Sequence, residues 1–271
     1  MDIRIHAIST GAVKLKTAQP RRKAGGALRI LLDRSWTEWL PMYAWVVEHP
    51  EGVVVVDTGE TARTSEPDYF HWAVRISVRM DVSPEQEIGP QLRDAGFDPD
   101  GVRMVVMTHL HTDHAGGLHH FPNTEILASN DEYQYARNQK LEYPSKHWPD
   151  WFSPSPIPFE PRAYGPFEES YSVTEAGDVV VVPTPGHTPH HVSVIVKTDG
   201  LSYFLAGDTS YTEEQLLERH PDAVSPKVKV AVQTMDRILR YAETEPTVYL
   251  PSHDPGSAER LRNKQTLNLA A

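Results

Sequence analysis

The sequence predicts an α/β protein with two packed mixed β-sheets covered by helices. Two apolar runs, residues 53–56 and 102–107, are typical of strands buried on both faces. Asp199-Gly200 lies between two alternating segments, which is a strong signal for a tight hairpin and therefore for antiparallel pairing. Helix-capping residues recur between the strands, so helices are expected to follow strands several times along the chain.

Alternation and β-branched residues predict the strands, which we place at residues 3–9, 27–32, 43–48, 53–56, 102–107, 125–128, 178–183, 191–197, 201–205 and 247–250. Four helices are predicted from their starts. Ser83-Pro84 opens a helix that Gly96 ends, and Asn130 begins a second that runs to about residue 139. Thr212 opens a third, and Ser225-Pro226 precedes the longest, whose apolar residues fall on one stripe.

Two segments are expected to be loops. Residues 17–26 are polar, basic and contain glycine. Residues 143–167 hold seven prolines among aromatic residues, and we interpret them as a cap over the functional site. No repeat or flexible linker marks a boundary, so residues 1–271 are predicted to form a single domain that includes this cap.

Composition excludes several classes of function. The chain has 271 residues, 39% of them hydrophobic, and a formal net charge of -11, which disfavours binding to nucleic acid or anionic membranes. The one basic cluster, residues 21–23, is short. There is no cysteine, which excludes disulfides, thiolate ligands and a cysteine nucleophile. No signal core or apolar span appears, so a cytoplasmic protein without a membrane span is expected.

The functional signal is a run of metal-ligating residues directly after the predicted strand at 102–107. His109, His111, Asp113 and His114 fall within six residues. A loop at a strand end can bring such side chains into one small volume. Imidazoles and carboxylates suit Zn²⁺ and its first-row neighbours, so we expect a metal site here.

Three further candidate ligands occupy similar places. His187, Asp208 and His253 each follow a predicted strand at a turn. Loops at strand ends carry function on a rigid scaffold. Seven candidate ligands are too many for one tetrahedral site and suit two metal ions. Asp208 is the natural bridge between them, because a carboxylate has two oxygens.

This pattern resembles the metallo-β-lactamase superfamily, from about residue 43 to His253. The motifs are the run at 109–114, Gly186-His187, Gly207-Asp208, the late His253 and Asp57-Thr58-Gly59 after a buried strand. The resemblance implies a four-layer αββα sandwich with a metal cleft at one edge. It assigns one metal to His109, His111 and His187, and the other to Asp113, His114 and His253. Asp208 and a hydroxide would bridge the two ions.

Other histidines near these motifs match no ligand of the family, namely His119, His120, His190 and His191. We interpret them as structural or solvated, with His190 or His191 as candidates to orient a ligand. Asp57 is expected to orient a ligand histidine rather than to bind metal, as carboxylates behind metal ligands do.

The surroundings of the metal motifs resemble the N-acyl-homoserine lactonases of this superfamily. Tyr211 follows Asp208 by three residues, and residues 40–43 and 114–117 also look like that group. The resemblance implies a hydrolase of carboxylic esters that opens the lactone ring and quenches quorum sensing. The hydroxide would attack the carbonyl, Tyr211 would stabilise the oxyanion, and Asp113 would deliver a proton to the leaving oxygen.

Other functions remain open at this point. A thioesterase like glyoxalase II would share the metals, but would normally place basic residues near the cleft. β-Lactamase activity is disfavoured without cysteine, and a nuclease is disfavoured by the net charge. A non-catalytic metal-binding scaffold is the alternative outside enzymes.

The expected cofactors are two divalent ions. Zn²⁺ is the first choice, and Fe, Mn or Co ions suit the same ligands. The expected partner is a lactone with an acyl chain, which would lie against apolar residues of the cap and of the tryptophan-rich stretch 36–45. That stretch is also a candidate homodimer face.

Overall fold

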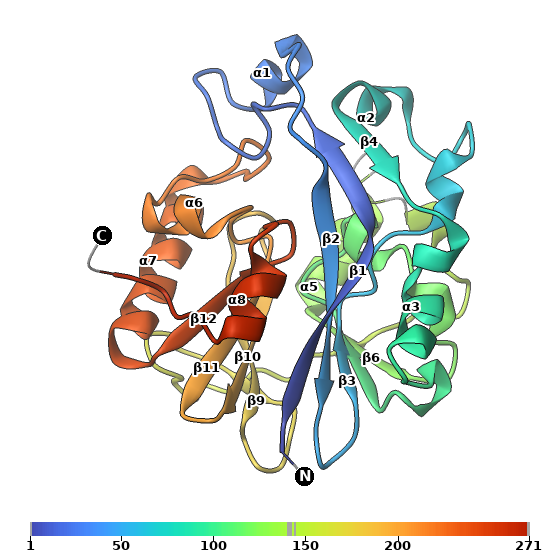
Figure 1. Ribbon diagram of the computed structural model, residues 1–271. Coiled ribbons are helices and arrows are strands. Elements are labelled where there is room, and N and C mark those ends of the chain that lie inside the picture. The colour runs from blue at the N-terminus through green and yellow to red at the C-terminus, as the bar shows by residue number, and fades with distance from the viewer. Residues whose placement is uncertain (1, 140–142, 144, 270–271) are drawn as a thin grey trace. The chain divides into compact units, whose positions relative to one another are not determined.

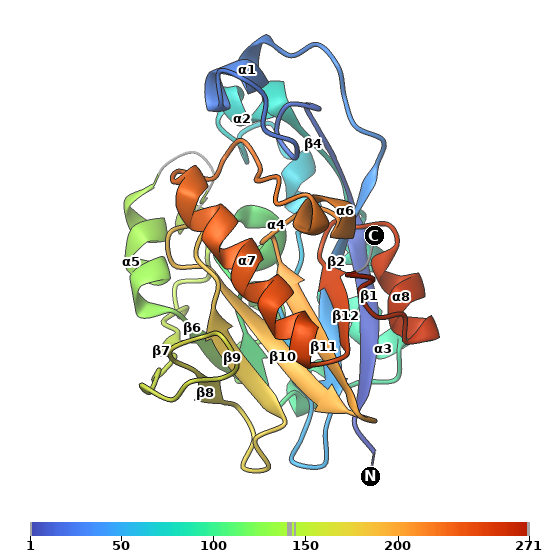
Figure 2. The ribbon, with the colours of Figure 1, turned by 90° about the vertical axis from the view of Figure 1, so that its left-hand side faces the viewer.

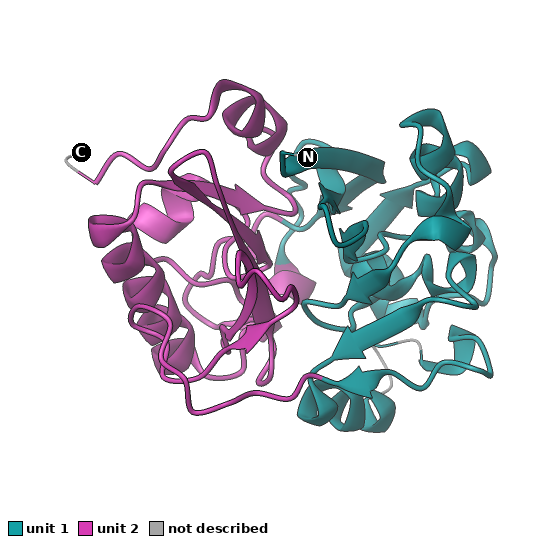
Figure 3. Ribbon diagram, turned by 90° about the horizontal axis from the view of Figure 1, so that it is seen from below, with its two compact units in different colours: residues 1–16, 33–156 teal, residues 17–32, 157–271 magenta. Residues whose placement is uncertain are grey.

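The computed structural model describes residues 2–139, 143 and 145–269 (Figures 1 and 2). The chain divides into two compact units (Figure 3). Unit 1 comprises Met1–Lys16 and Asp33–Pro156, and unit 2 comprises Thr17–Leu32 and Ile157–Ala271. Each unit has its own mixed sheet, its own helices and its own apolar core.

The sheet of unit 1 has the strand order β4-β1-β2-β3-β5-β6-β7. Its strands are β1 (Arg4–Leu15), β2 (Leu40–Glu48), β3 (Val54–Val56), β4 (Val78–Asp81), β5 (Met104–Val106), β6 (Glu125–Ala128) and β7 (Ser155–Pro156). Pairing is antiparallel from β4 to β3 and parallel from β3 to β7. Because β3 and β5 are parallel neighbours, the chain leaves both strands at the same edge of the sheet.

Short helices follow the strands of unit 1. They are α2 (Trp72–Ser77), α3 (Ile88–Asp94), α4 (Thr112–Ala115) and α5 (Asn130–Asn138), with 3₁₀ turns at Ala62–Ser65, Pro84–Gln86, Pro99–Gly101, Leu118–His120 and Ser145–His147. Leu92 of α3 belongs to the same buried apolar cluster as Val55 and Val105 from the central strands. This packing holds the edge that carries the metal motif.

The sheet of unit 2 has the order β12-β11-β10-β9-β8. Its strands are β8 (Tyr171–Ser172), β9 (Val179–Pro183), β10 (Val192–Thr198), β11 (Leu201–Gly207) and β12 (Thr247–Pro251), and its helices are α1 (Ala27–Leu32), α6 (Glu213–Leu217), α7 (Val228–Thr244) and α8 (Ser257–Asn263). Pairing is antiparallel except between β11 and β12.

The long helix α7 lies across this sheet (Figure 2). Its residues Met235, Ile238 and Leu239 pack in one cluster with Phe204 and Val180 of the strands. The apolar stripe predicted for this helix is therefore its buried face, as expected for a helix that covers a sheet.

Several predicted elements are confirmed. The β10–β11 hairpin turns at Asp199 and Gly200, which both have positive φ angles, 55° and 73°. This is the backbone that a primed two-residue turn requires. Ser83 and Gln86 form the predicted capping box, and Gly96, with φ 89°, follows the end of α3. The two mixed sheets with covering helices agree with the predicted fold class.

Other local predictions were wrong. Residues 27–32 form helix α1 and not a strand, because no neighbouring strand pairs with them among the described residues. No helix or strand was predicted within residues 61–80, which contain α2 and most of β4. The prediction that residues 143–167 are mostly loop agrees with the structure, where this segment contains the 3₁₀ turn Ser145–His147, β7 and isolated bridges, and residue 144 lies outside the described residues. Within the described part of the chain, no helix is long and apolar enough to span a membrane.

Candidate active site

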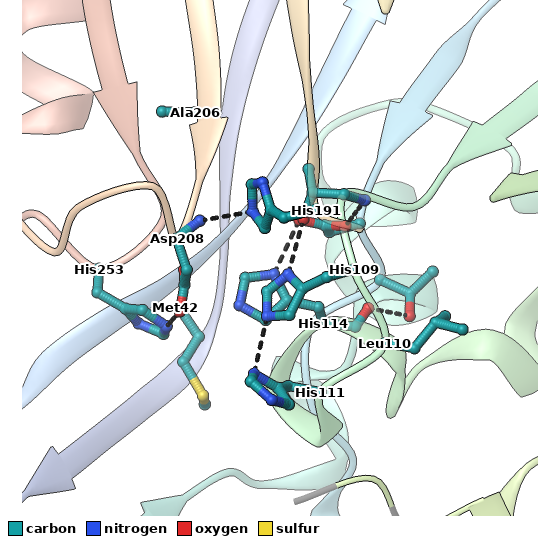
Figure 4. A network of polar contacts seen from close by, with 12 residues as sticks. Met42, His109, Leu110, His111, His114, His191, Ala206, Asp208 and His253 are labelled. Atoms are coloured by element: carbon teal, nitrogen blue, oxygen red, sulfur yellow. Dashed lines mark hydrogen bonds and ion pairs between the residues drawn. The ribbon is translucent and has the colours of Figure 1, made fainter. Parts of the chain in front are cut away.

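The ligand run of unit 1 leaves β5 and turns into α4. His109 and His114 are buried, and His111 is the residue before the helix begins. His109 Nε2 lies 3.0 Å from His111 Nδ1, as Figure 4 shows. Asp113 and His114 each offer a ligand atom within 4.8 Å of the other. The predicted run therefore gathers its four side chains in one region of unit 1.

Asp57 holds this run from behind. Its Oδ1 accepts a hydrogen bond from the Thr108 N–H at 2.8 Å, and its Oδ2 accepts one from the Thr108 hydroxyl at 2.8 Å. His114 Nδ1 lies 2.8 Å from the same Oδ2. A carboxylate at Nδ1 places the ring proton there, so Nε2 is the nitrogen that could bind a metal ion. The prediction that Asp57 orients a ligand histidine agrees with this geometry.

The segment after Asp57 also holds the metal motif. Thr58 donates from both its N–H and its hydroxyl to the His114 carbonyl, each at 2.8 Å. Gly116 N–H donates to the Gly59 carbonyl at 2.9 Å. A Cβ at position 116 would lie 2.3 Å from Glu60 Oε1, so only glycine allows this close approach. The Asp-Thr-Gly and Ala-Gly-Gly motifs are thus parts of one contact.

Glu60 is a buried carboxyl beneath this contact. Its Oε2 lies 2.6 Å from the Thr112 hydroxyl, and its Oε1 accepts from Thr61 N–H at 2.9 Å. Burial raises the pKa of Glu60 to about 8, although these hydrogen bonds oppose the shift. At neutral pH this side chain is therefore a neutral acid that supports the helix turn carrying Asp113.

In unit 2, two of the predicted ligands, His187 and His253, lie close to the same carboxylate oxygen of the third, Asp208. His187 follows β9, Asp208 follows β11 and His253 follows β12. Asp208 Oδ2 lies 3.3 Å from His253 Nε2 (Figure 4). The same oxygen lies 3.4 Å from His187 Nε2. Two ligands on a tetrahedral Zn²⁺ with bonds of about 2.0–2.1 Å are about 3.3 Å apart. The donor types and their spacing therefore fit a divalent metal ion.

His191 fixes the backbone of Asp208. The Asp208 N–H donates to His191 Nε2 at 3.1 Å, so the ring proton is on Nδ1. His191 Nδ1 lies 2.9 Å from the Thr184 hydroxyl, which lies 2.8 Å from the Ser193 hydroxyl. Ser193 in turn donates to the Ala206 carbonyl at 3.2 Å. Of the two histidines considered for an orienting role, His191 has this contact.

Asp222 performs for His187 the role that Asp57 performs for His114. Asp222 Oδ2 lies 2.7 Å from His187 Nδ1, and both side chains are buried. Asp222 Oδ1 accepts from the Ser225 N–H at 2.6 Å, which fixes the carboxylate. Sequence reasoning missed this residue. Its signal was an aspartate three residues before the predicted helix start Ser225-Pro226, from where its side chain can accept a hydrogen bond from a nearby backbone N–H.

Arg22 fastens the segment that carries Asp222. Its guanidinium Nη1 donates to the carbonyls of Asp222, Ala223 and Ser225 at 3.4, 3.3 and 3.2 Å. The Arg22 N–H also donates to the Pro221 carbonyl at 3.2 Å. The basic loop 17–26, for which the sequence predicted no role, therefore fixes the segment that carries Asp222, the residue in contact with His187.

Tyr211 is buried beside two of the ligands. Its ring stacks on His253 with centroids 5.3 Å apart, and meets the His187 ring edge-on at 6.1 Å. The Tyr211 N–H donates to Gln215 Oε1 at 3.0 Å, which fixes its backbone at the start of α6. The residue expected to act on substrate thus lies against the ligand set of unit 2.

Comparisons with known proteins agree with these motifs. The family model of the metallo-β-lactamase superfamily matches residues 37–253. The N-acyl homoserine lactonase AttM of Rhizobium radiobacter is 26% identical over 265 residues, 94% of each chain. The N-acyl homoserine lactonase AiiA of Bacillus thuringiensis subsp. kurstaki is 29% identical over 225 residues, 79% of this chain and 82% of the relative.

A solved structure shares the fold along nearly the whole chain. It is an N-acyl homoserine lactone hydrolase with the product N-hexanoyl-L-homoserine bound at its catalytic metal centre. The two are 24% identical, with a TM-score of 0.79 over 96% of each chain. Since the family model covers most of the sequence and includes every predicted ligand, the chain belongs to the metallo-β-lactamase superfamily.

Proposed function

We propose that this protein is a metal-dependent hydrolase that opens the lactone ring of N-acyl-homoserine lactones, the reaction that quenches quorum sensing. The observation that carries the proposal is the place of Tyr211, buried against the ligands His253 and His187. A phenol there is suited to donate a hydrogen bond to an oxygen that gains negative charge. The lactonases AttM and AiiA, similar over most of the chain, support the same substrate class.

We propose that the seven residues together hold two divalent metal ions, Zn²⁺ as the first choice. They are His109, His111, Asp113, His114, His187, Asp208 and His253. Bound divalent ions would lower the pKa of water and polarise the lactone carbonyl. The chemistry of the donors and their spacing around Asp208 support this assignment.

The chain's own residues have distinct roles in the proposed reaction. Water adds to the carbonyl carbon, the ring C–O bond breaks, and the ring oxygen leaves as a hydroxyl. Tyr211 donates to the carbonyl oxygen as its charge develops. Asp113 takes up the proton that the attacking water loses and delivers it to the leaving ring oxygen. Asp57 and Asp222 keep the ligand histidines in the required tautomer and orientation.

The acyl chain is proposed to lie against apolar residues of the 36–45 stretch and the 143–167 segment. Trp39 and Trp151 have 43% and 42% of their surface exposed, so each offers an apolar face. A homodimer through the tryptophan-rich stretch remains a prediction, and light scattering at micromolar concentration would test it. The single domain over residues 1–271 also remains a prediction, for which one calorimetric unfolding transition is expected.

The first experiment compares an N-acyl-homoserine lactone with S-lactoylglutathione as substrates of the metal-loaded protein. We expect fast lactone opening that a chelator abolishes, with little thioester turnover. Faster thioester hydrolysis would move the protein to the thioesterase branch. The structure gives that branch little support, because Arg21 pairs with Glu218 and Arg22 is bound to carbonyls of its own unit.

The role of Tyr211 is tested with Tyr211→Phe, which keeps the ring and removes the hydroxyl. We expect kcat with lactones to fall by about 10- to 100-fold, the scale of a lost hydrogen-bond donor to an oxyanion. Tyr171→Phe in the edge strand β8 is a matched control and should keep full activity. Unchanged turnover by Tyr211→Phe would remove this hydroxyl from the mechanism.

A further inference from the structure

A second group of metal-ligating side chains lies in unit 1, outside the seven proposed ligands. Glu87 stands between the 3₁₀ turn Pro84–Gln86 and α3, and His119 and His120 belong to the 3₁₀ turn Leu118–His120. We propose that Glu87, His119 and His120 bind a further divalent metal ion of the Zn²⁺ class. This site is independent of the proposed lactone reaction.

Both histidines approach the same oxygen of Glu87. His119 Nε2 lies 2.9 Å and His120 Nε2 lies 2.7 Å from Glu87 Oε2. The two imidazole rings are neighbours, with centroids 4.1 Å apart. One ligand atom from each of the three residues lies within 4.8 Å of the others. Two imidazoles and one carboxylate are a common ligand set for zinc.

The far side of each anchored ligand is already satisfied. Glu87 Oε1 accepts from the Thr61 hydroxyl at 3.0 Å and from the Ala62 N–H at 2.9 Å, which leaves Oε2 for the histidines. His119 Nδ1 lies 3.2 Å from the Gly116 carbonyl. Metal-binding histidines and carboxylates are usually oriented by such contacts at the atoms that do not touch the metal.

The contact of His119 with the Gly116 carbonyl also determines which ring nitrogen of His119 carries the proton. A carbonyl oxygen only accepts, so Nδ1 carries the proton in the neutral ring. The lone pair of Nε2 then faces the lone pairs of Glu87 Oε2, which is repulsive. Either a second proton or a metal cation between the two atoms removes this repulsion. Because His120 Nε2 approaches the same oxygen, one divalent ion would bind both histidines together with Glu87 Oε2.

The charge and the space of the site suit a cation. Burial raises the pKa of Glu87, but the hydrogen bonds from residues 61–62, and those from both histidines when their Nε2 atoms carry a proton, outweigh it and leave the pKa well below its usual range. Glu87 is therefore ionised at neutral pH. A Cβ at Gly89 would lie 2.4 Å from His120 Nδ1, so the glycine makes room for the ring.

The site is open on one side. The side chain of His119 is 45% exposed, against 18% for His120 and 10% for Glu87. Ligands of Zn²⁺ stand about 3.3 Å apart, so binding requires the nitrogens to move outward by about half an ångström. The exposed His119 has the freedom to do so, and water can complete the coordination.

The experiment counts the metal that the metal-loaded protein retains after dialysis against micromolar Zn²⁺. We expect the double variant His119→Asn/His120→Asn to retain one equivalent less than the wild type. Glu87→Gln, which keeps the shape of the side chain, should show the same loss. His6→Asn is the matched control, since His6 Nε2 and Glu48 Oε2, 3.4 Å apart, form a pair of one histidine and one carboxylate. Equal metal content in all four proteins would overturn the proposal.

A second measurement does not depend on the folding of variants. Crystals of the wild-type protein grown with Zn²⁺ should show an anomalous peak at about 2.0–2.2 Å from Glu87 Oε2 and both Nε2 atoms. Absence of that peak, while zinc is present at other sites, would mean that protonated histidines pair with Glu87, and the proposal would be wrong. Lactonase activity of the variants separates this result from the proposed function, because none of the three residues belongs to the catalytic set.

Discussion

The proposed metal ligands of unit 1 and the proposed metal ligands of unit 2 are arranged in opposite ways. In unit 1, four ligands come from one continuous run that leaves β5 and enters α4. In unit 2, three ligands come from the ends of β9, β11 and β12, separated by 21 and 45 positions in the printed sequence. Both sets nevertheless rely on the same device, a buried aspartate at Nδ1 of one ligand histidine.

The difference teaches how each set is held in place. The unit 1 run is fixed by short contacts with the neighbouring loop at 57–60, which leaves the parallel strand β3 at the same sheet edge. The positions of the unit 2 ligands depend instead on side chains from other elements, namely His191, Asp222 and Arg22. We therefore expect unit 2 to respond to substitutions at a larger number of positions remote from its ligands.

The largest expected effect is that of Asp208→Asn. This change removes the charge on which His187 and His253 converge. We expect lactone turnover to fall by about a thousandfold or more, which corresponds to about 4 kcal/mol in the barrier. Metal content should fall in parallel. The control Asp199→Asn lies in an exposed hairpin turn paired with Lys264, and wild-type kinetics are expected for it.

The raised pKa of Glu60 should make the free energy of unfolding depend on pH. Its pKa is raised to about 8 when folded, against 4.5 in the unfolded chain. Below pH 4.5 both states are protonated and its contribution to stability is complete; it is lost as pH rises to about 8. Since one pKa unit is about 1.4 kcal/mol, the loss is on the order of a few kcal/mol.

Denaturant unfolding across this pH range measures the contribution of Glu60. The Glu60→Gln variant should lack the decline, while Glu125→Gln on an exposed strand position should retain it. A wild-type stability that does not fall relative to Glu60→Gln between pH 4.5 and 8 would contradict the raised pKa.

Asp57→Asn and Asp222→Asn compare the two orienting carboxylates directly. Loss of such a partner typically costs 10- to 100-fold in metal affinity or activity, about 1.4–2.7 kcal/mol. We expect the larger loss for Asp57→Asn, because Asp57 also accepts two hydrogen bonds from Thr108. Competition with a metal indicator gives the affinity of each variant. A larger loss of metal affinity for Asp222→Asn than for Asp57→Asn would contradict this expectation.

Arg22→Met tests whether the basic loop acts through Asp222. We expect a smaller effect, about 3- to 10-fold in kcat and in metal affinity, since Arg22 contacts carbonyls and not the ligand itself. The double variant Arg22→Met/Asp222→Asn should lose little more kcat and metal affinity than Asp222→Asn alone. Arg21→Met is the control, because Arg21 pairs with Glu218 at the surface. Full additivity in the double variant would separate Arg22 from the Asp222 contact.

The strands near the metal motifs were predicted well because their patterns are local. The valine runs of β3 and β9 and the Asp199-Gly200 turn need no distant partner to be recognised. The run 109–114 was found for the same reason. Residues 27–32 show the limit of this reasoning, since the same apolar letters suit a strand or a helix until pairing decides.

Contacts between distant positions could not be read in the same way. Asp222 lies 35 positions from His187, and Arg22 lies 200 positions from Asp222. Nothing in the local pattern of either residue names its partner. The contact of Asp57 with His114 agrees with the role predicted for Asp57, which was based on the general behaviour of carboxylates behind metal ligands. For the orienting histidine, the pattern left the neighbours His190 and His191 as candidates, and only the contact with the Asp208 N–H separates them.

The backbone conformation of Asp57 limits which residues can replace it during evolution. Its φ angle of 62° lies in the left-handed region, which glycine and asparagine adopt more readily than other residues do. Glycine has no group for Thr108 or His114, and asparagine would present a neutral amide to the imidazole. Glutamate keeps the charge but is unfavourable at this angle. No amino-acid replacement that a single-nucleotide change can produce from aspartate therefore supplies both the conformation and the charge, and we expect purifying selection to keep aspartate at this position.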